Sequence, residues 1–248
     1  MALVTVALAF ASNFLLIRIA ESEFNSAQQT MQTLGLQVDD VAWIIGRTET
    51  VRYSSRYGGV SFEPALKYAI YVNGAAEPSW EFNTGIVCFN MPVSQHSLGN
   101  DYFRLVYPSS DDGFLFAGAS SPVARVFEVE KLPMADGSFV RVVVAPTIRM
   151  LNLSIGGTRY VRLYLPILNV TSSSGNSQSI TLTGESVETK TIEGVTSIRV
   201  EASFPEALSG FDSSFFSFDP NPVVFSLAGS AVLEVYLGGV DVAFGVHA

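Results

Sequence analysis

The sequence predicts an α+β protein in which a long N-terminal α-helix is followed by an all-β globular domain, antiparallel and sandwich-like. Three observations predict this organisation. Residues 1–17 carry no charged side chain, residues 18–47 repeat with a helical period, and the apolar pattern of the remaining chain alternates with a period near two. We therefore expect a helix over residues 1–47 and a β domain over residues 48–248, the latter either one unit or two that divide near residue 175.

The first 17 residues are apolar around the whole circumference of a helix, with Thr5, Ser12 and Asn13 as the only polar side chains. A helix of this kind has to be enclosed by other apolar groups. Its rise of about 25 Å is short against a hydrocarbon layer of about 30 Å, so it is at best a short membrane span. The first charge, Arg18, follows the apolar run, so we expect the segment to be retained and not cleaved as a secretory signal peptide.

Residues 18–47 are amphipathic, because apolar side chains recur at steps of three and four while Glu, Gln and Asp fall between them. No proline occurs before Pro64, so both halves can form one helix that ends near Gly46. We expect the apolar stripe to pack this helix on the β domain, although a dimeric coiled coil over residues 18–45 is the alternative. The packing residues are Phe24, Met31, Leu34, Val38, Val41 and Ile45.

The rest of the chain consists of short runs rich in Val, Ile, Tyr, Phe and Thr, separated by Gly, Pro, Asn and Asp. Pairs of turn residues predict three hairpins, at Asp136-Gly137, Gly156-Gly157 and Gly238-Gly239. The polar stretch over residues 171–179 is expected to be an exposed loop. A phenylalanine-rich segment over residues 211–225 is expected to plug the β core, and the alternative is a patch that a neighbouring subunit covers.

Composition argues against several classes of function. The chain has 14 Lys and Arg against 23 Asp and Glu, and its net charge of −9 repels phosphate backbones, so no nucleic-acid partner is expected. The two histidines are far apart and the single Cys88 lies in an apolar run, so we expect neither a metal nor a cofactor. Asp111-Asp112-Gly113 and Asp219-Pro220-Asn221 are interpreted as turns. No catalytic motif is present, so we do not expect an enzyme.

Two sequons give candidate N-glycosylation sites, at Asn152 and at Asn169. Asn169 precedes the polar loop, where a glycan can be accommodated, whereas Asn152 falls in an expected strand. The interpretation therefore favours Asn169, and glycans are retained as candidate partners.

The order of an uncharged helical tip, an amphipathic helix and an all-β domain resembles the mature form of a type IV pilin, and its β-sandwich version is the archaeal one. The helix exit over residues 38–43 and 46–48 is also similar to archaeal pilin-like sequences. Thr5 stands where bacterial pilins carry Glu, which favours an archaeal over a bacterial pilus. The short basic leader that the prepilin peptidase of this family removes is missing, which implies either that this is the processed chain or that Met1 is a true start and the resemblance fails.

The resemblance further implies a structural role. The tip would be held in the cytoplasmic membrane before assembly and would then pack with identical subunits as the core of a helical, extracellular cell-surface filament. The β domain would stay exposed for adhesion or surface contact. The implied assembly residues are Leu3, Val4, Val6, Leu8, Phe10, Phe14, Leu15 and Ile17.

Three alternatives remain open at this point. Within the same superfamily, the chain could be an archaellum subunit, which serves motility, or a minor pilin. From another class, it could be a membrane-anchored cell-surface binding protein that recognises glycans or a surface-layer neighbour. An anchored β-rich hydrolase is the third alternative, although no recognisable catalytic arrangement identifies it.

Overall fold

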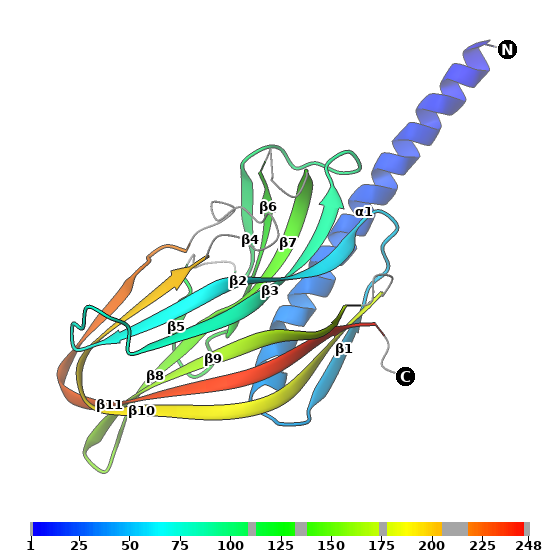
Figure 1. Cartoon of the computed structure of the whole chain (residues 1–248). Coiled ribbons are helices and arrows are strands. Elements are labelled where there is room, and N and C mark those ends of the chain that lie inside the picture. The colour runs from blue at the N-terminus through cyan, green and yellow to red at the C-terminus, as the bar shows by residue number, and fades with distance from the viewer. Residues whose placement is uncertain (1, 109–112, 132–137, 174–177, 205–217, 246–248) are drawn as a thin grey trace.

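A computed structural model describes residues 2–108, 113–131, 138–173, 178–204 and 218–245 of the chain. Within the N-terminal helix, side chains are described at Ala11 and from Phe14 onward. In these residues the chain forms one helix and eleven strands, and the helix projects far beyond the β domain (Figure 1). The prediction of one N-terminal helix followed by a mostly β domain is therefore confirmed.

Helix α1 (Ala2–Ala42) is a single continuous element, as the lack of proline predicts. It ends four residues earlier than expected, because the chain turns at residues 43–47, where Gly46 has a φ of 81° and donates its N–H to the Gly184 carbonyl oxygen at 2.8 Å. Glycine adopts this left-handed conformation without the steric cost that a Cβ imposes. The turn leads directly into the first strand.

All strands belong to one sheet, with the order β4-β6-β7-β3-β2-β10-β11-β9-β8-β5, and β1 pairs separately with β10. The strands before and after residue 175 thus lie in the same sheet. Their bounds are β1 Thr48–Arg52, β2 Gly59–Val72, β3 Trp80–Pro92, β4 Tyr102–Tyr107, β5 Leu115–Ala117, β6 Ala124–Glu130, β7 Phe139–Pro146, β8 Ile148–Ile155, β9 Thr158–Ser173, β10 Ser179–Ser203 and β11 Val223–Phe244.

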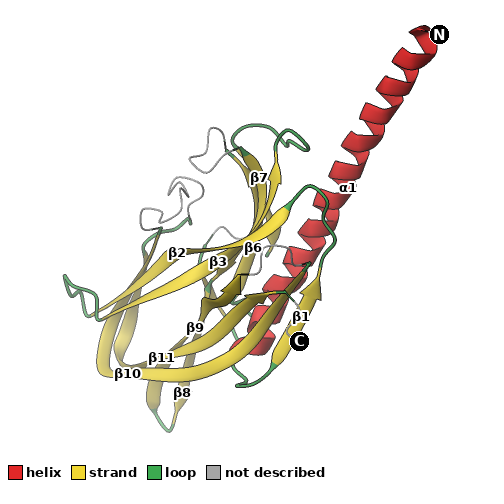
Figure 2. Cartoon of the chain, turned by 45° about the vertical axis from the view of Figure 1, so that its right-hand side comes forward, coloured by secondary structure: helices red, strands yellow, loops and turns green. Residues whose placement is uncertain are grey.

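The sheet is mixed, so an antiparallel-only domain is not confirmed. Strands β9 and β11 run parallel over most of their length, and β5 is parallel to β8. A separate-sheet sandwich is not confirmed either, because β10 takes part in both halves of the structure. Residues 179–183 of β10 pair with β1, whereas residues 198–203 pair with β2. The sheet thereby folds back, and β2 and β3 lie over β9, β10 and β11 (Figure 2).

The three expected hairpins have different outcomes. Gly156-Gly157 connects the antiparallel strands β8 and β9 and is confirmed as a hairpin turn. Gly238-Gly239 lies inside β11, so the hairpin expected there is wrong. Gly238 serves close approach instead, because a Cβ at this position would collide with the carbonyl oxygen of Ala42 at the end of α1. Asp136-Gly137 lies outside the described residues.

Apolar side chains fill two cores, one on each face of the sheet. Strand β7 shows the division: Val143 and Ala145 belong to the core between the two halves of the sheet, whereas Val142 and Val144 belong to the core beneath α1. Cys88 and Phe218 are buried in the first core. Of the phenylalanine-rich segment, residues 211–217 lie outside the described part of the chain.

Candidate assembly interface

The stretch of α1 that has left the β domain carries large apolar side chains in contact with solvent. Phe14, Leu15, Leu16, Ile17 and Ile19 are each between 45% and 60% exposed, and Ala20 is the first fully buried residue among the helix side chains that the structure describes. Exposed apolar surface of this density is typical of an interaction site. The segment continues directly into the projecting turns at the N-terminus (Figure 1).

The structure gives the expected assembly residues a common helical backbone. Phe14, Leu15 and Ile17 are among the exposed side chains. The side chains of Leu3, Val4, Val6, Leu8 and Phe10 lie outside the described part, although their backbone continues the same helix. Within the residues whose side chains the structure describes, no helix is both long enough and apolar enough to cross a membrane.

C-terminal to this exposed stretch, one face of α1 packs on the β domain. Phe24, Met31, Leu34, Val38 and Val41 are buried there, against strands that include β6 and β7. Spacings of three and four place them on one face of the helix.

Ile45 was expected in the same set and does not pack there. Its side chain is 67% exposed, because α1 ends at Ala42 and the following turn carries Ile45 away from the sheet.

A carboxylate fastens α1 at the point where the helix leaves the β domain. Glu23 accepts hydrogen bonds through Oε1 from four groups of the loop between β1 and β2. These groups are the Ser55 hydroxyl and the backbone N–H groups of Arg56 at 2.9 Å, Tyr57 at 2.8 Å and Gly58 at 3.2 Å. We call this arrangement the Glu23 clamp.

The clamp changes the acidity of its own carboxyl group. Desolvation alone would raise the pKa of Glu23, but the hydrogen bonds from Ser55, Tyr57, Arg56 and Gly58 outweigh it, so the pKa lies below its usual value. The charged form is therefore the one that the loop stabilises.

Two further polar contacts fix the direction of α1. In the middle of the helix, Gln28 accepts a hydrogen bond at 3.2 Å from Arg104, whose guanidinium also binds the buried carboxylate of Glu128 through two contacts of 2.9 Å. Near the helix end, Asp39 forms an ion pair with Arg149 of β8. Together with the Glu23 clamp, these contacts hold the helix against the β domain at three positions along its length.

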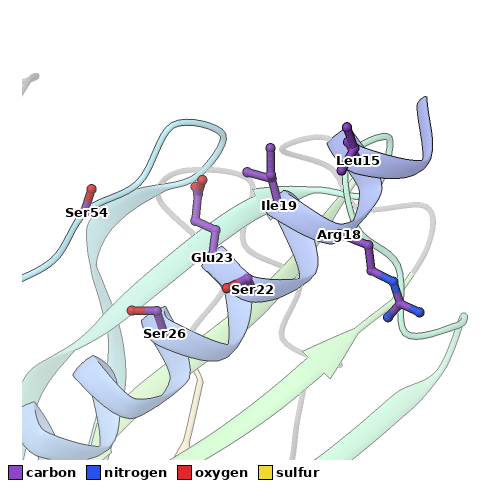
Figure 3. Close-up of a pocket in the computed structure, with 7 residues that line it drawn as sticks. All are labelled: Leu15, Arg18, Ile19, Ser22, Glu23, Ser26 and Ser54. Carbon is purple, nitrogen blue, oxygen red and sulfur yellow. The ribbon is translucent and has the colours of Figure 1, made fainter. Parts of the chain in front are cut away.

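An open groove lies beside α1 next to the Glu23 clamp (Figure 3). Its volume is about 380 Å³. One wall is the loop that carries Ser54, and the other is the helix itself. The lining residues are Leu15, Arg18, Ile19, Ser22, Glu23, Ser26 and Ser54.

A second surface feature lies past the C-terminal end of α1 and was not anticipated. The edge of the Trp43 ring system meets Tyr164 at 5.4 Å and 87°, and Tyr164 stacks on Tyr236 at 4.9 Å and 10°. Beside them, Arg162 Nε donates to Glu234 Oε2 at 2.6 Å. Within each strand these residues are two positions apart, which predicts that they share one face of the sheet. The contact between the two strands depends on the parallel pairing of β9 with β11, which the local sequence does not reveal.

Both candidate N-glycosylation residues are exposed. Asn152 lies in β8 and accepts a hydrogen bond from Arg159 Nε at 3.0 Å, while Asn169 lies in β9 opposite Asp241 of β11. Both asparagines are therefore in strands, and exposure does not distinguish them.

Within the described ranges, no group of three or more His, Cys, Asp or Glu side chains is placed to hold a metal ion. No protein family, curated protein or solved structure matches the chain.

Proposed function

We propose that this chain is the structural subunit of an extracellular, type IV pilus-like filament of an archaeon. The observation that carries the proposal is the exposed apolar stretch of α1 over residues 14–19, on a helix that continues away from the β domain. Apolar surface of this kind is stabilised when other apolar groups bury it. In a polymer, the identical helices of neighbouring subunits bury it. The β domain remains outside and provides the surface for adhesion.

The rigid attachment of α1 supports this role. A polymer transmits force through its subunits, so the helix that joins neighbours has to be fixed to the domain that faces the environment. The buried stripe from Phe24 to Val41, the Glu23 clamp and the Asp39–Arg149 pair supply that attachment. Before assembly, the apolar tip resides in the cytoplasmic membrane.

The proposal is tested on material sheared from cells that produce the chain. Negative-stain electron microscopy, combined with peptide mass spectrometry of the sheared fraction, is expected to show filaments that contain this chain with its apolar N-terminal peptide. A chain that stays monomeric in detergent extracts of membranes contradicts the proposal and favours an anchored cell-surface binding protein. Loss of swimming instead of attachment, in cells without the chain, would assign the filament to motility.

A further inference from the structure

We propose that the open edge of strand β10 over residues 186–192 pairs with the same edge of a second copy of this chain, in an antiparallel and two-fold symmetric contact. The contact involves the β domain alone. It goes beyond the proposed function, which concerns α1, and it does not depend on that function.

One edge of strand β10 is occupied only at its two ends. Residues 179–183 pair with β1, and residues 198–203 pair with β2. Next to these pairings, Gly184 binds the backbone of Gly46 and Arg47, while Asn73 binds the backbone at residues 194, 196 and 197. Between these ends, no strand that the structure describes pairs with this side of β10. The segment therefore presents backbone N–H and C=O groups that a further strand can bind.

The shape of β10 selects one register for such a strand. Pairing with β11 is uninterrupted from Ser186 to Ile192, and a register shift bounds this stretch at each end. Irregularities of this kind bend a strand and end its regular pairing. The whole regular stretch can pair with its own copy only when its central residue, Thr189, lies opposite Thr189 of the second copy.

The charges on the edge select the same register. With Thr189 at the centre, Glu188 lies opposite Lys190 of the second copy, and symmetry creates this pair twice. Directly opposed residues of antiparallel strands share the same hydrogen-bonding state, so a slip moves the strands by two residues. Either slip would oppose Glu188 to Glu188 or Lys190 to Lys190. Glu185 and Glu193 lie beyond the regular stretch, where they are exposed and solvent screens their charge.

The uncharged side chains of the stretch are also self-complementary. Thr189 meets its own copy, and Val187 meets Thr191 of the second copy. Cross-strand pairs of threonine and of β-branched residues stabilise a sheet. The sheet already contains such a pair along the same edge, because Thr50 of β1 and Thr181 of β10 share a hydrogen bond of 3.0 Å.

A second copy fits this edge better than an unrelated strand. Charged side chains on an open edge repel strands whose charges do not match them. The copy matches both in charge and in the length of its regular stretch. The edge is thus protected against unrelated strands and complementary to itself.

Disulfide formation in the full chain, dispersed in detergent, tests the inference. Thr189→Cys places two thiols on directly opposed residues, whose Cα atoms lie about 4.5–5.5 Å apart in an antiparallel pair, a separation that a disulfide spans. We expect mild oxidation to give covalent dimers. Thr191→Cys is the matched control on the same face, because its two copies lie about 14 Å apart along the strands. The natural Cys88 is buried and adds little background.

A mixed sample tests the register directly. Val187→Cys and Thr191→Cys should each remain monomeric alone and should form a heterodimer when mixed, because the two positions are opposed. Disulfides that form through chance collision would appear equally in all three samples.

Charge reversal gives an independent measurement. Lys190→Glu, added to Thr189→Cys, should reduce the yield of dimer by about tenfold at low salt, because two attractive cross-strand pairs become repulsive. The further change Glu188→Lys exchanges the two charges and should restore the yield.

The pairing has a consequence for the proposed filament. One screw operation relates all subunits of a helical filament, so a two-fold contact between outer domains joins subunits of two different filaments. Filaments should therefore associate side by side, and Lys190→Glu should reduce this bundling without reducing filament yield. This consequence rests on the proposed function, whereas the pairing of two chains does not.

The outcomes separate the inference from the proposed function. The inference is overturned if Thr189→Cys gives no dimer, if Thr191→Cys gives as much, or if charge reversal has no effect, and the filament proposal then still stands. Register-specific dimers from a chain that forms no filaments would support the pairing and refute the proposed function.

Discussion

Gly184 of β10 lies directly against the carbonyl oxygen of Val41 at the end of α1, and a Cβ built on Gly184 would stand 2.5 Å from that oxygen. Gly184 also donates its N–H to the Arg47 carbonyl oxygen at 2.9 Å and accepts from the Gly46 N–H. The end of the helix therefore contacts the backbone of β10 directly, in addition to the buried side chains of Val41 and Ala42. This seat fixes the base of the proposed assembly helix.

Adding a methyl group at this seat should lift the helix from the sheet. We expect Gly184→Ala to lower the free energy of unfolding by about 1–3 kcal/mol, the usual effect of overpacking a well-packed site. Denaturant unfolding of the full chain checks this value. Gly59→Ala is the control, because a Cβ there meets nothing within 4 Å. Equal stability of the two variants would contradict the close contact.

The Glu23 clamp predicts a pH dependence of stability. Because its folded-state pKa lies below the ordinary value of 4.5, the clamp contributes fully above about pH 4.5 and loses that contribution as the pH falls through the folded-state pKa. The stability difference between the unmodified chain and Glu23→Gln should thus be constant near neutral pH and shrink below pH 4.5.

Thermal unfolding measured from pH 7 to pH 3 tests this prediction. Glu21→Gln is the matched control, since Glu21 forms an ion pair with Arg18 at an exposed site, and its effect should stay within about 0.5 kcal/mol. A difference for Glu23→Gln that does not change with pH would show that the carboxylate is not bound as described.

The ion pair between Asp39 and Arg149 predicts a further loss of stability. Removing the carboxylate in Asp39→Ala leaves the guanidinium of Arg149, which is 13% exposed, with the Ser121 carbonyl oxygen at 2.6 Å but without its charged partner. We expect destabilisation by about 1–2 kcal/mol. The neighbouring Asp40→Ala serves as the control, because Asp40 only approaches Arg47 at 3.8 Å on the surface. A double-mutant cycle with Arg149→Ala should show a coupling energy, and additive effects would contradict a direct pair.

The long helix could be predicted from the sequence because its evidence is local. Phe24 and Met31 lie seven residues apart, so their shared face follows from helical geometry alone. The same periodicity wrongly placed Ile45 on that face. The end of α1 is set by the turn at Gly46, whose N–H binds the Gly184 carbonyl oxygen of the distant strand β10.

The sheet was harder to predict because its evidence is not local. Gly238-Gly239 has the composition of a hairpin turn, yet it allows the close approach of α1. A glycine pair gives the same local signal in both situations, and only the position of α1 decides between them. The parallel pairing of β9 with β11 depends likewise on contacts between residues about 70 positions apart, such as Tyr164 and Tyr236.

The candidate assembly interface also combines features that the sequence predicts with features that it does not. The exposed apolar stretch at Phe14 and Ile17 follows from composition. The groove and the Glu23 clamp do not, because Glu23 meets a loop more than 30 residues further along the chain.

The central claim is that the exposed apolar segment of α1 joins identical subunits, and filament yield of charge variants tests it most directly. Leu15→Asp introduces a charge at an exposed position, so the monomer should still fold, but an unpaired charge in a helix core costs several kcal/mol per subunit. Val224→Asp makes the same change at a 61% exposed position of the β domain. Sheared filaments should be lost for Leu15→Asp and retained for Val224→Asp. Normal filament yield from a folded Leu15→Asp chain would contradict the account.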